Sequence, residues 1–579
     1  MDLQPKRIMT GAFVVVLLAW LIASLLFSGE EPDILVNQDP LSFDAENAYR
    51  IAKEFVTENP GRVFGSLESR QSTGYLHDAL TASGYEIEYT HFEARIGGRP
   101  HVGRNVLAFK KGETTEVLAV TAHYDTVGAT VEGAMKNGAA VGVLLELARG
   151  LRETPTRRSL LFVFTDGGEW GSIGARDIAS GESHEYDIAA VLSLDRVGIG
   201  ELAAFRLGET GQLKGFTPRW LRELALRAAE TEGLPVKASS GLKEYLERTW
   251  LIPRTEQGPF LSAGIAAINL GSVSSNLARE KAIYHSPEDT MENITVDGMR
   301  AFGRAAERII RTIDALPAIP RESPDAFRMR DSVFMGSTAR SALHILSFLP
   351  LPVFFCLLLL RQRPHLHSGR IGREMLLLSM TFLPFLAAYF CLQLCFHMRL
   401  FPLYTLYPPA ANHPVIENPA WGIVWVIFGT AVFVGLICFL IARFNLKYWP
   451  KPDFISSKFV LSAFLLITVF FALLHNTYWA MTFMLLPAWL WTIIGNGETA
   501  GKRLINRVWV LVAAVPCMIA LVWFASGLGL GLNFIWYQIL ALTTGLFSTS
   551  GFFIGALAVA LGLRFLAIQS HEGPAASSG

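Results

Sequence analysis

Apolar and polar residues are distributed in two different ways along this chain. Up to about residue 335, short apolar runs are separated by charged residues, whereas from Ser341 onward long apolar runs dominate. A further uncharged run covers residues 9–28. About 20 consecutive apolar residues span a bilayer as a helix. The pattern therefore predicts a soluble domain between two membrane-embedded parts.

Runs with helical spacing alternate with strand-like runs in the soluble part. Helices are predicted at 45–59, 69–84, 137–153, 219–233 and 296–316, with a short one from Ser172, and strands at 85–95, 102–111, 116–125, 159–167, 188–198 and 265–273. Apolar strands that alternate with amphipathic helices indicate an α/β fold, here a three-layer sandwich with a mostly parallel sheet. Functional residues in such folds gather at the carboxyl ends of the strands.

Eight stretches are long and apolar enough to be membrane-spanning helices. They cover residues 9–28, 341–361, 375–396, 421–442, 459–475, 479–495, 508–526 and 546–568. The last has an alternative interpretation, because 530–568 is almost continuously apolar and has room for a second or re-entrant segment. No Asp, Glu, Lys or Arg lies mid-span, which disfavours a transporter. The chain thus divides into an N-terminal membrane anchor (1–29), a soluble domain (30–335), an all-α seven-span domain (336–570) and a short tail (571–579).

Basic residues between the predicted spans indicate the orientation in the membrane. Lys6 and Arg7 precede the first span, and further basic clusters separate the second span from the third, the fourth from the fifth and the sixth from the seventh. The positive-inside rule makes all of these clusters cytoplasmic. We expect a cytoplasmic N-terminus and a soluble domain on the periplasmic, extracellular or lumenal side. The sequence SGEEPD after the first span lacks a cleavage signal, so the anchor is expected to stay uncleaved.

Composition narrows the range of partners and ligands. Lys and Arg total 50, as do Asp and Glu, so the formal net charge is zero and no nucleic-acid partner is expected. The lipid bilayer is the expected partner of the apolar half. All five cysteines lie in that half. The soluble domain therefore has neither disulfides nor thiolate metal ligands.

Histidine and carboxylate residues follow several of the predicted strands. His123 and Asp125 end one strand, Glu169 follows the next, and Asp195 ends a third, while His285 comes later in the chain. Because the carboxyl ends of parallel strands meet at one edge of the sheet, we expect these side chains to lie close together.

Five motifs around these residues occur in a defined order over about residues 45–315: AHYDTV, NGAAVGVLLELAR, FVFTDGGEWGSIGA, LSLDRVG and YHSPEDTMENI. In this order they resemble the di-zinc aminopeptidase and glutamate carboxypeptidase family, metallopeptidase family twenty-eight. The resemblance implies a zinc-exopeptidase-like sandwich. The positions that match the family's metal ligands are His123, Glu169, Asp195 and His285. Asp125 matches the catalytic-site carboxylate that orients the neighbouring histidine, and two zinc ions would polarise a carbonyl and activate a water.

Two positions depart from the family pattern. Lys136 stands where active members carry the Asp that bridges both metals, and Gly168 stands where they carry the Glu that takes a proton from the attacking water. A protonated lysine cannot ligate a metal, and without the bridge each zinc keeps fewer than the three protein ligands expected of a catalytic site. Loss of the general base lowers the reaction rate by roughly 10²–10⁴-fold. The family's Ser-Asp-His stretch corresponds to Thr255, Glu256 and Gln257.

Lys136 has a physical interpretation of its own. Glu169 and Asp195 would repel each other if they were buried together without a cation. We therefore predict that Lys136 takes the place of the metal as a fixed cation, bound by Glu169, Asp195 and Asp125.

Other acidic residues leave alternatives open. Glu132 is near enough in the loop to replace the missing bridge, and Asp166 is a candidate for a displaced base. The acidic residues of SPEDT, after His285, are expected to cap the following helix.

Two classes of function fit these observations. The first is a non-catalytic pseudopeptidase that binds a peptide or a lipid-linked group, or acts as a scaffold for partner membrane proteins. The second is an active membrane-bound metallopeptidase of the aminopeptidase type with a non-standard site. Zinc is the one cofactor that the resemblance implies, and Lys136 makes it doubtful. The topology also resembles the peptidase-like subunit of the glycosylphosphatidylinositol transamidase complex, which implies a scaffold role.

Overall fold

The computed structural model describes most of the chain from residue 34 to residue 569. Within that range it leaves out 97–98, 199, 254, 321–325, 331–332, 402–413, 447–448, 451–452, 498 and 546, and before it the described residues are 11, 14–16, 18–20 and 22. The predicted tail at 571–579 and most of the predicted anchor at 1–29 lie outside the described residues.

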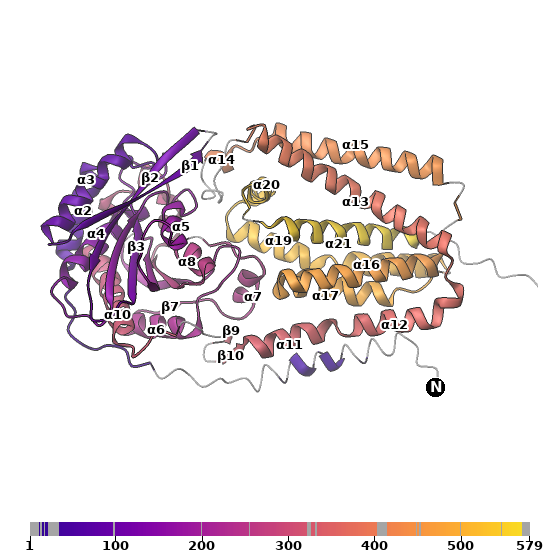
Figure 1. The fold of residues 1–579 in the computed structure, drawn as a ribbon, viewed down its shortest axis with the longest axis horizontal. Helices are drawn as coiled ribbons and strands as arrows, with labels where there is room; N and C mark the ends of the chain where they lie inside the picture. The colour runs from indigo at the N-terminus through magenta and orange to yellow at the C-terminus, as the bar shows by residue number, and fades with distance from the viewer. Residues whose placement is uncertain are drawn as a thin grey trace, which may run out of the picture.

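An eight-stranded mixed sheet forms the centre of the N-terminal half (Figure 1). Its strands lie side by side in the order β1 (Ile87–Ile96), β2 (Arg99–Lys110), β4 (Ser159–Thr165), β3 (Val117–His123), β5 (Ile188–Leu194), β8 (Ala266–Ser274), β6 (Leu202–Gly208) and β7 (Val236–Lys237). The central strands β4, β3, β5 and β8 run parallel, as do β6 and β7. The pairs β1–β2, β2–β4 and β6–β8 are antiparallel.

Helices cover both faces of this sheet. One face packs against α2 (Ala45–Glu58), α3 (Leu67–Ala82), α4 (Ala139–Leu151), α6 (Arg219–Glu230) and α10 (Val296–Ala315), and the other against α5 (Ile173–Ser180) and α8 (Gln257–Ala263). Successive side chains of a strand point to opposite faces: in β3, Leu118 and Val120 join the larger core, whereas Val117 and Ala119 join the smaller one. The predicted three-layer sandwich is confirmed. Shorter elements that the sequence pattern did not predict include β6, β7, α7 (Gly241–Thr249), α8, α9 (Leu277–Ile283), the paired strands β9 (Ala326–Arg330) and β10 (Val333–Gly336), and the irregular segment η1 (Ala134–Gly138).

The parallel register brings three strand ends to one edge of the sheet. His123, the last residue of β3, pairs with Thr165 at the end of β4. On its other side β3 pairs with β5 through Thr121 and Ser193, and Asp195 directly follows β5. The loops that leave these strands therefore start next to one another.

The C-terminal half is a bundle of apolar helices (Figure 1). Among the described residues, six helical segments are long and apolar enough to cross a membrane: Ser337–His365, Ser368–His397, Trp421–Asn445, Phe454–His475, Ala500–Gly527 and Thr549–Ile568. The elements in this half are α11 (Ser337–Phe348), α12 (Pro350–Gln362), α13 (Ser368–His397), α14 (Pro414–Glu417), α15 (Trp421–Asn445), α16 (Phe454–His475), α17 (Thr477–Ile493), α18 (Ala500–Val512), α19 (Val515–Gly527), α20 (Phe534–Thr544) and α21 (Thr549–Ile568).

Two features of this bundle refine the predicted spans. The span predicted at 479–495 corresponds to α17, a 17-residue helix that shares a hydrophobic core with α16. The apolar stretch 530–568 contains two helices, the 11-residue α20 and the 20-residue α21, so the second segment considered for this stretch is present. At 1.5 Å per residue, α20 is about 16 Å long and too short to cross a bilayer.

The described residues of the predicted span 9–28 are helical and pack against the bundle. Val16 lies in a small apolar cluster with Trp489 of α17. The indole Nε1 of Trp20 donates a hydrogen bond to Ser347 Oγ at 3.1 Å.

A buried ion pair joins three helices near one end of the bundle. Arg564 of α21 makes two hydrogen bonds of 2.9 Å to Glu374 of α13, and Ser457 of α16 donates a third of 2.9 Å to the same carboxylate. The side chain of Glu374 is fully buried. Paired Arg–carboxylate bonds are among the stronger charge-assisted hydrogen bonds.

We predict that Glu374→Gln destabilises the membrane domain by about 3–5 kcal/mol, because it leaves the Arg564 guanidinium buried without its counter-charge. Thermal unfolding of the detergent-solubilised chain measures the change. The control is Arg300→Gln, which removes an exposed ion pair with Glu46 and should have no measurable effect. Equal midpoints for the two variants would contradict the prediction.

Candidate functional site

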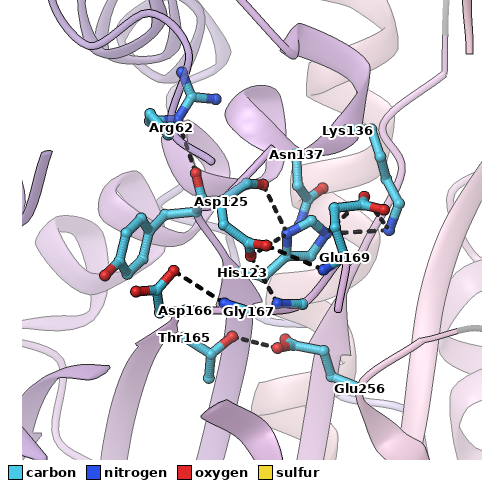
Figure 2. Close-up of polar contacts among 12 residues, drawn as sticks. Arg62, His123, Asp125, Lys136, Asn137, Thr165, Asp166, Gly167, Glu169 and Glu256 are labelled. Carbon is cyan, nitrogen blue, oxygen red and sulfur yellow. Dashed lines mark hydrogen bonds and ion pairs between the residues drawn. The ribbon is translucent and has the colours of Figure 1, made fainter. Parts of the chain in front are cut away.

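The side chains that the sequence singled out gather at the carboxyl edge of the central strands, and Figure 2 shows His123, Asp125, Lys136 and Glu169 among them. His123 ends β3, Glu169 follows β4 by four residues, and Asp195 directly follows β5. Lys136 comes from η1 before α4, and His285 comes from the turn after α9. The most exposed of these five residues is Glu169, at 7%.

Lys136 lies at the centre of this cluster. Its Nζ is 2.8 and 2.7 Å from the two carboxylate oxygens of Asp195 and 3.5 Å from Oε1 of Glu169. The same ammonium lies 3.1 Å from Nε2 of His123. On its far side, Glu169 Oε2 lies 3.1 Å from Nε2 of His285. The ammonium therefore contacts three of the four residues that match the family's metal ligands.

The electrostatics of the cluster favour its charged forms. Burial alone would lower the pKa of Lys136, but Asp195 and Glu169 raise it above its ordinary value. Burial alone would also raise the pKa of both carboxyls, yet Lys136 holds the pKa of Asp195 below its usual value, and His285 with Lys136 does the same for Glu169. The ammonium and the carboxylates thus stabilise one another against the cost of burial.

Asp125 lies on the opposite side of His123 from Lys136. Its Oδ1 is 3.2 Å from Nδ1 of His123, and its carboxylate accepts hydrogen bonds from the backbone N–H groups of Gly168 at 2.7 Å and Glu169 at 3.1 Å. An ammonium can only donate, so Nε2 of His123 accepts from Lys136 and Nδ1 carries the proton shared with Asp125. The expectation that Asp125 also binds Lys136 is wrong, because the two ring nitrogens face opposite sides.

Gly168 packs directly on the imidazole of His123. A Cβ at position 168 would lie 2.3 Å from Cγ and 2.4 Å from Cβ of His123, well inside contact distance. Any side chain there would force His123 or the loop to move. The position of His123 and the glycine at 168 therefore depend on each other.

Neighbouring loops hold the segment that carries the lysine. The side chain of Asn137 donates to Leu194 O at 3.1 Å and accepts from the backbone N–H of Arg196 at 3.1 Å. Asp289 Oδ1 accepts from the backbone N–H of Met135 at 2.6 Å, and burial raises the pKa of Asp289 to about 6. The lysine is thus fixed from β5 on one side and from the loop before α10 on the other.

Two expectations about acidic residues are wrong. The carboxylate of Glu132 accepts a hydrogen bond from the backbone N–H of Met291 at 2.7 Å, and the bridging position is occupied by Lys136. The helix after His285 is capped by Thr295, whose side chain accepts from Gly298 N, whereas Asp289 is used to hold η1.

Asp166 occupies a separate position behind the site (Figure 2). Its Oδ1 accepts hydrogen bonds from Ser69 Oγ at 3.1 Å and from the backbone N–H of Gly167 at 3.0 Å. It lines a cavity of about 200 Å³ together with Arg104. Burial and the nearby Asp125 raise the pKa of Asp166 to about 8. Its use as a displaced base stays a prediction.

Arg62 is a structural member of the site that the sequence did not single out. It is fully buried and donates to Tyr124 O at 2.7 Å and to Glu132 O at 2.9 Å. Burial lowers the pKa of its guanidinium to about 10, against the opposing influence of Asp125. A single arginine in a loop gives no sequence signal, because its role depends on backbone atoms more than 60 residues away.

The residues present do not fit a resident zinc ion. Within the part of the chain that the structure describes, no group of three or more His, Cys, Asp or Glu side chains is arranged to hold a metal. His123 Nε2 is 3.8 Å from Glu169 and 3.9 Å from Asp195, and the donor atoms that would face a metal face Lys136 Nζ instead. A cation already fixed at this point would repel a second one.

The fold of the N-terminal half is a zinc-exopeptidase-like sandwich. Residues 105–310 match the sequence model of Peptidase family M28. The chain therefore contains an M28 peptidase domain, and the family resemblance of its motifs is confirmed.

Similar proteins include a conversion protein, a subunit of a complex and a zinc aminopeptidase. The alkaline phosphatase isozyme conversion protein of Escherichia coli is 28% identical over 258 residues, which cover 40% of this chain and 72% of that protein. The BOS complex subunit NCLN of Canis lupus familiaris is 26% identical over 230 residues, which cover 35% of this chain and 39% of that protein. The solved structure of BSAP, a zinc aminopeptidase from Bacillus subtilis, is 16% identical with a TM-score of 0.40, and the match covers 48% of this chain and 96% of that one.

We predict that Lys136→Met lowers the free energy of unfolding by about 3–5 kcal/mol, because it leaves Glu169 and Asp195 buried without their cation. The double variant Lys136→Met/Asp195→Asn should recover part of this loss, since one of the two uncompensated charges is then removed. Urea unfolding of the full chain in detergent measures both. A double variant that is no more stable than Lys136→Met alone would contradict the coupling.

We also predict that Gly168→Ala destabilises the chain by about 1–3 kcal/mol, because the new methyl group overlaps His123. Gly128→Ala is a matched control in a nearby loop, since a Cβ there meets nothing within 4 Å. The control should stay within about 0.5 kcal/mol of the parent. Equal unfolding midpoints for the two alanine variants would show that position 168 tolerates a side chain.

Proposed function

We propose that this chain is a membrane-integrated pseudopeptidase: its M28 domain binds a polypeptide without hydrolysing it, and Lys136 replaces the metal. The observation that carries the proposal is the position of the Lys136 ammonium, 2.7–2.8 Å from both oxygens of Asp195 and 3.1 Å from His123. A metal-free site lacks both the Lewis acid and the activated water of metallopeptidase chemistry.

Gly168 supports the same conclusion independently. The family's general base would have to stand at this position, and the close contact with His123 excludes a glutamate there without rearrangement. Loss of the bridge and loss of the base therefore belong to one altered arrangement rather than to two unrelated substitutions. The M28 domain would then bind a polypeptide without cleaving it and act as a scaffold within a membrane assembly.

The proposed orientation places the M28 domain on the periplasmic, extracellular or lumenal side, with the N-terminus in the cytoplasm. Two contacts between basic residues and neighbouring helix ends support it: Arg373 donates to Trp449 O at 2.7 Å, and Lys458 donates to Ile494 O at 2.5 Å. These basic residues lie at the start of α13 and α16, the ends that point away from the M28 domain in Figure 1. Basic residues at that end favour a cytoplasmic location for it.

Metal content is the direct test of the proposed function. The full-length protein is purified in detergent, incubated with excess zinc, dialysed against a weak chelator and measured by mass spectrometry for metal per chain. We expect well under 0.1 zinc per chain, and no aminopeptidase activity on peptide substrates.

The matched variant is Lys136→Asp, which restores the family's bridging carboxylate. We expect it to retain about one or two zinc ions per chain, because Glu169, Asp195 and the two histidines are then free to ligate. Stoichiometric zinc in the parent protein, together with peptidase activity that depends on Glu169, would overturn the proposal and favour the active metallopeptidase.

A further inference from the structure

The M28 domain sits on one end of the membrane bundle through α7 and the segment that follows it (Figure 1). Thr249 Oγ1 lies 3.0 Å from Thr482 Oγ1 of α17, and the side chain of Asn476 donates to Arg248 O at 2.9 Å. Behind this contact, Arg248 and Arg222 both bind the fully buried carboxylate of Glu244. These buried ion pairs therefore hold α7 in place at the contact with the bundle.

Trp250 anchors this contact in the bundle. Its ring packs against four phenylalanines, with centroid distances of 5.0 Å to Phe524, 5.5 Å to Phe547, 5.9 Å to Phe534 and 6.3 Å to Phe483. These residues come from α17, α19, α20 and the connection between α20 and α21. Aromatic pairs of this geometry add to the energy of apolar burial, so the two halves of the chain are held in a defined arrangement.

Glu256, close to Trp250 in the sequence, contacts two of the strands that carry the site. Six residues after Trp250, the buried carboxylate of Glu256 accepts hydrogen bonds from Thr121 of β3, at 3.2 Å, and from Thr165 of β4. Thr165 is the ladder partner of His123. Trp250 and Glu256, six residues apart in the chain, thus contact the bundle and the strands beneath the site respectively.

A second contact brings the bundle to the rim of the site itself. Trp170, the residue after Glu169, packs against an apolar group that we call the bundle-end cluster. This cluster combines Leu246 of α7 with buried residues of the membrane half, among them Leu392, Phe401, Phe524, Phe534 and Trp536. Trp170, and with it the loop that carries Glu169, therefore packs against the same apolar group as α20, a helix that is too short to cross a bilayer.

We propose that the site receives the end of a membrane-anchored polypeptide, which reaches it past the bundle-end cluster, and that freely diffusing peptides are poor ligands. This inference rests on the proposed polypeptide-binding function. The placement suits such a ligand, because a polar chain end would meet the charged residues while its anchor stays in the bilayer next to the apolar bundle. Tethering also raises the effective concentration of the chain end at the site to the millimolar range.

Photo-crosslinking in lipid nanodiscs tests this inference with the full-length protein. Three synthetic peptides share one sequence with a diazirine residue at the amino terminus: one ends in a palmitoylated lysine after a spacer of about 6 residues, one in the same lipid after about 30 residues, and one has no lipid. Six extended residues reach about 20 Å. Mass spectrometry counts crosslinks to the loops that carry Glu169 and His285.

We expect the short tethered peptide to label these loops at least tenfold more than the untethered peptide at equal concentration, and more than the long tethered one. Equal labelling by the untethered peptide would overturn the inference and leave polypeptide binding intact. Labelling by the long tethered peptide alone would also overturn it, since the site would then lie far from the membrane surface. If no peptide labels the loops, the proposed polypeptide binding fails, and the inference fails with it.

Variants of the docking contact give a second readout. The advantage of the short tether is the ratio of crosslinks from the short tethered peptide to crosslinks from the untethered peptide. Trp250→Ala should reduce this ratio at least threefold. Trp425→Ala should leave it unchanged, because Trp425 is 64% exposed on α15. Thr482→Val removes the interdomain hydroxyl contact with a milder change, and it should act in the same direction if Trp250→Ala does not fold. An unchanged advantage in a folded docking variant would contradict the role of this contact.

Discussion

The ion pair between Lys136 and Asp195 is the interaction on which the rest of the site depends. Two carboxylates, Glu169 and Asp195, are almost fully buried next to each other, and such a pair is stable only with a cation between them. In a metallopeptidase the metal has that role. Here the ammonium has it, held in place because Asn137 and Asp289 fix its backbone segment from two sides. The carboxylates at the strand ends are thereby kept in place with an ammonium between them.

This substitution also explains why the neighbouring changes fit together. His123 accepts from Lys136 on one side and binds Asp125 on the other, so its orientation is set without a metal. Gly168 leaves room for the imidazole in that position, which a glutamate would not. Asp125, in turn, holds the loop of Gly168 and Glu169 through two backbone N–H groups. Each of these residues therefore has a structural role in the site.

The sequence predicted the parts of the molecule that follow from local pattern. The central strands and the long helices have clear periodicity, and the ends of parallel strands meet at one edge, so the approach of His123, Glu169 and Asp195 could be foreseen. The two-residue β7 and the nine-residue α7 are too short to give a clear pattern and were missed. Arg62 and Asp289 act through backbone atoms of distant segments, which no local signal reveals. The docking of Trp250 on the bundle depends on four phenylalanines from other parts of the chain and could only be found in three dimensions.

The most direct measurement of the central claim is an experimental structure of the full-length protein prepared with excess zinc, with anomalous diffraction data collected at the zinc absorption edge. The account predicts no anomalous peak among His123, Glu169, Asp195 and His285, with density for Lys136 Nζ within hydrogen-bonding distance of both oxygens of Asp195. A strong peak at that point, with the lysine side chain turned away, would contradict it and make the site a metal centre.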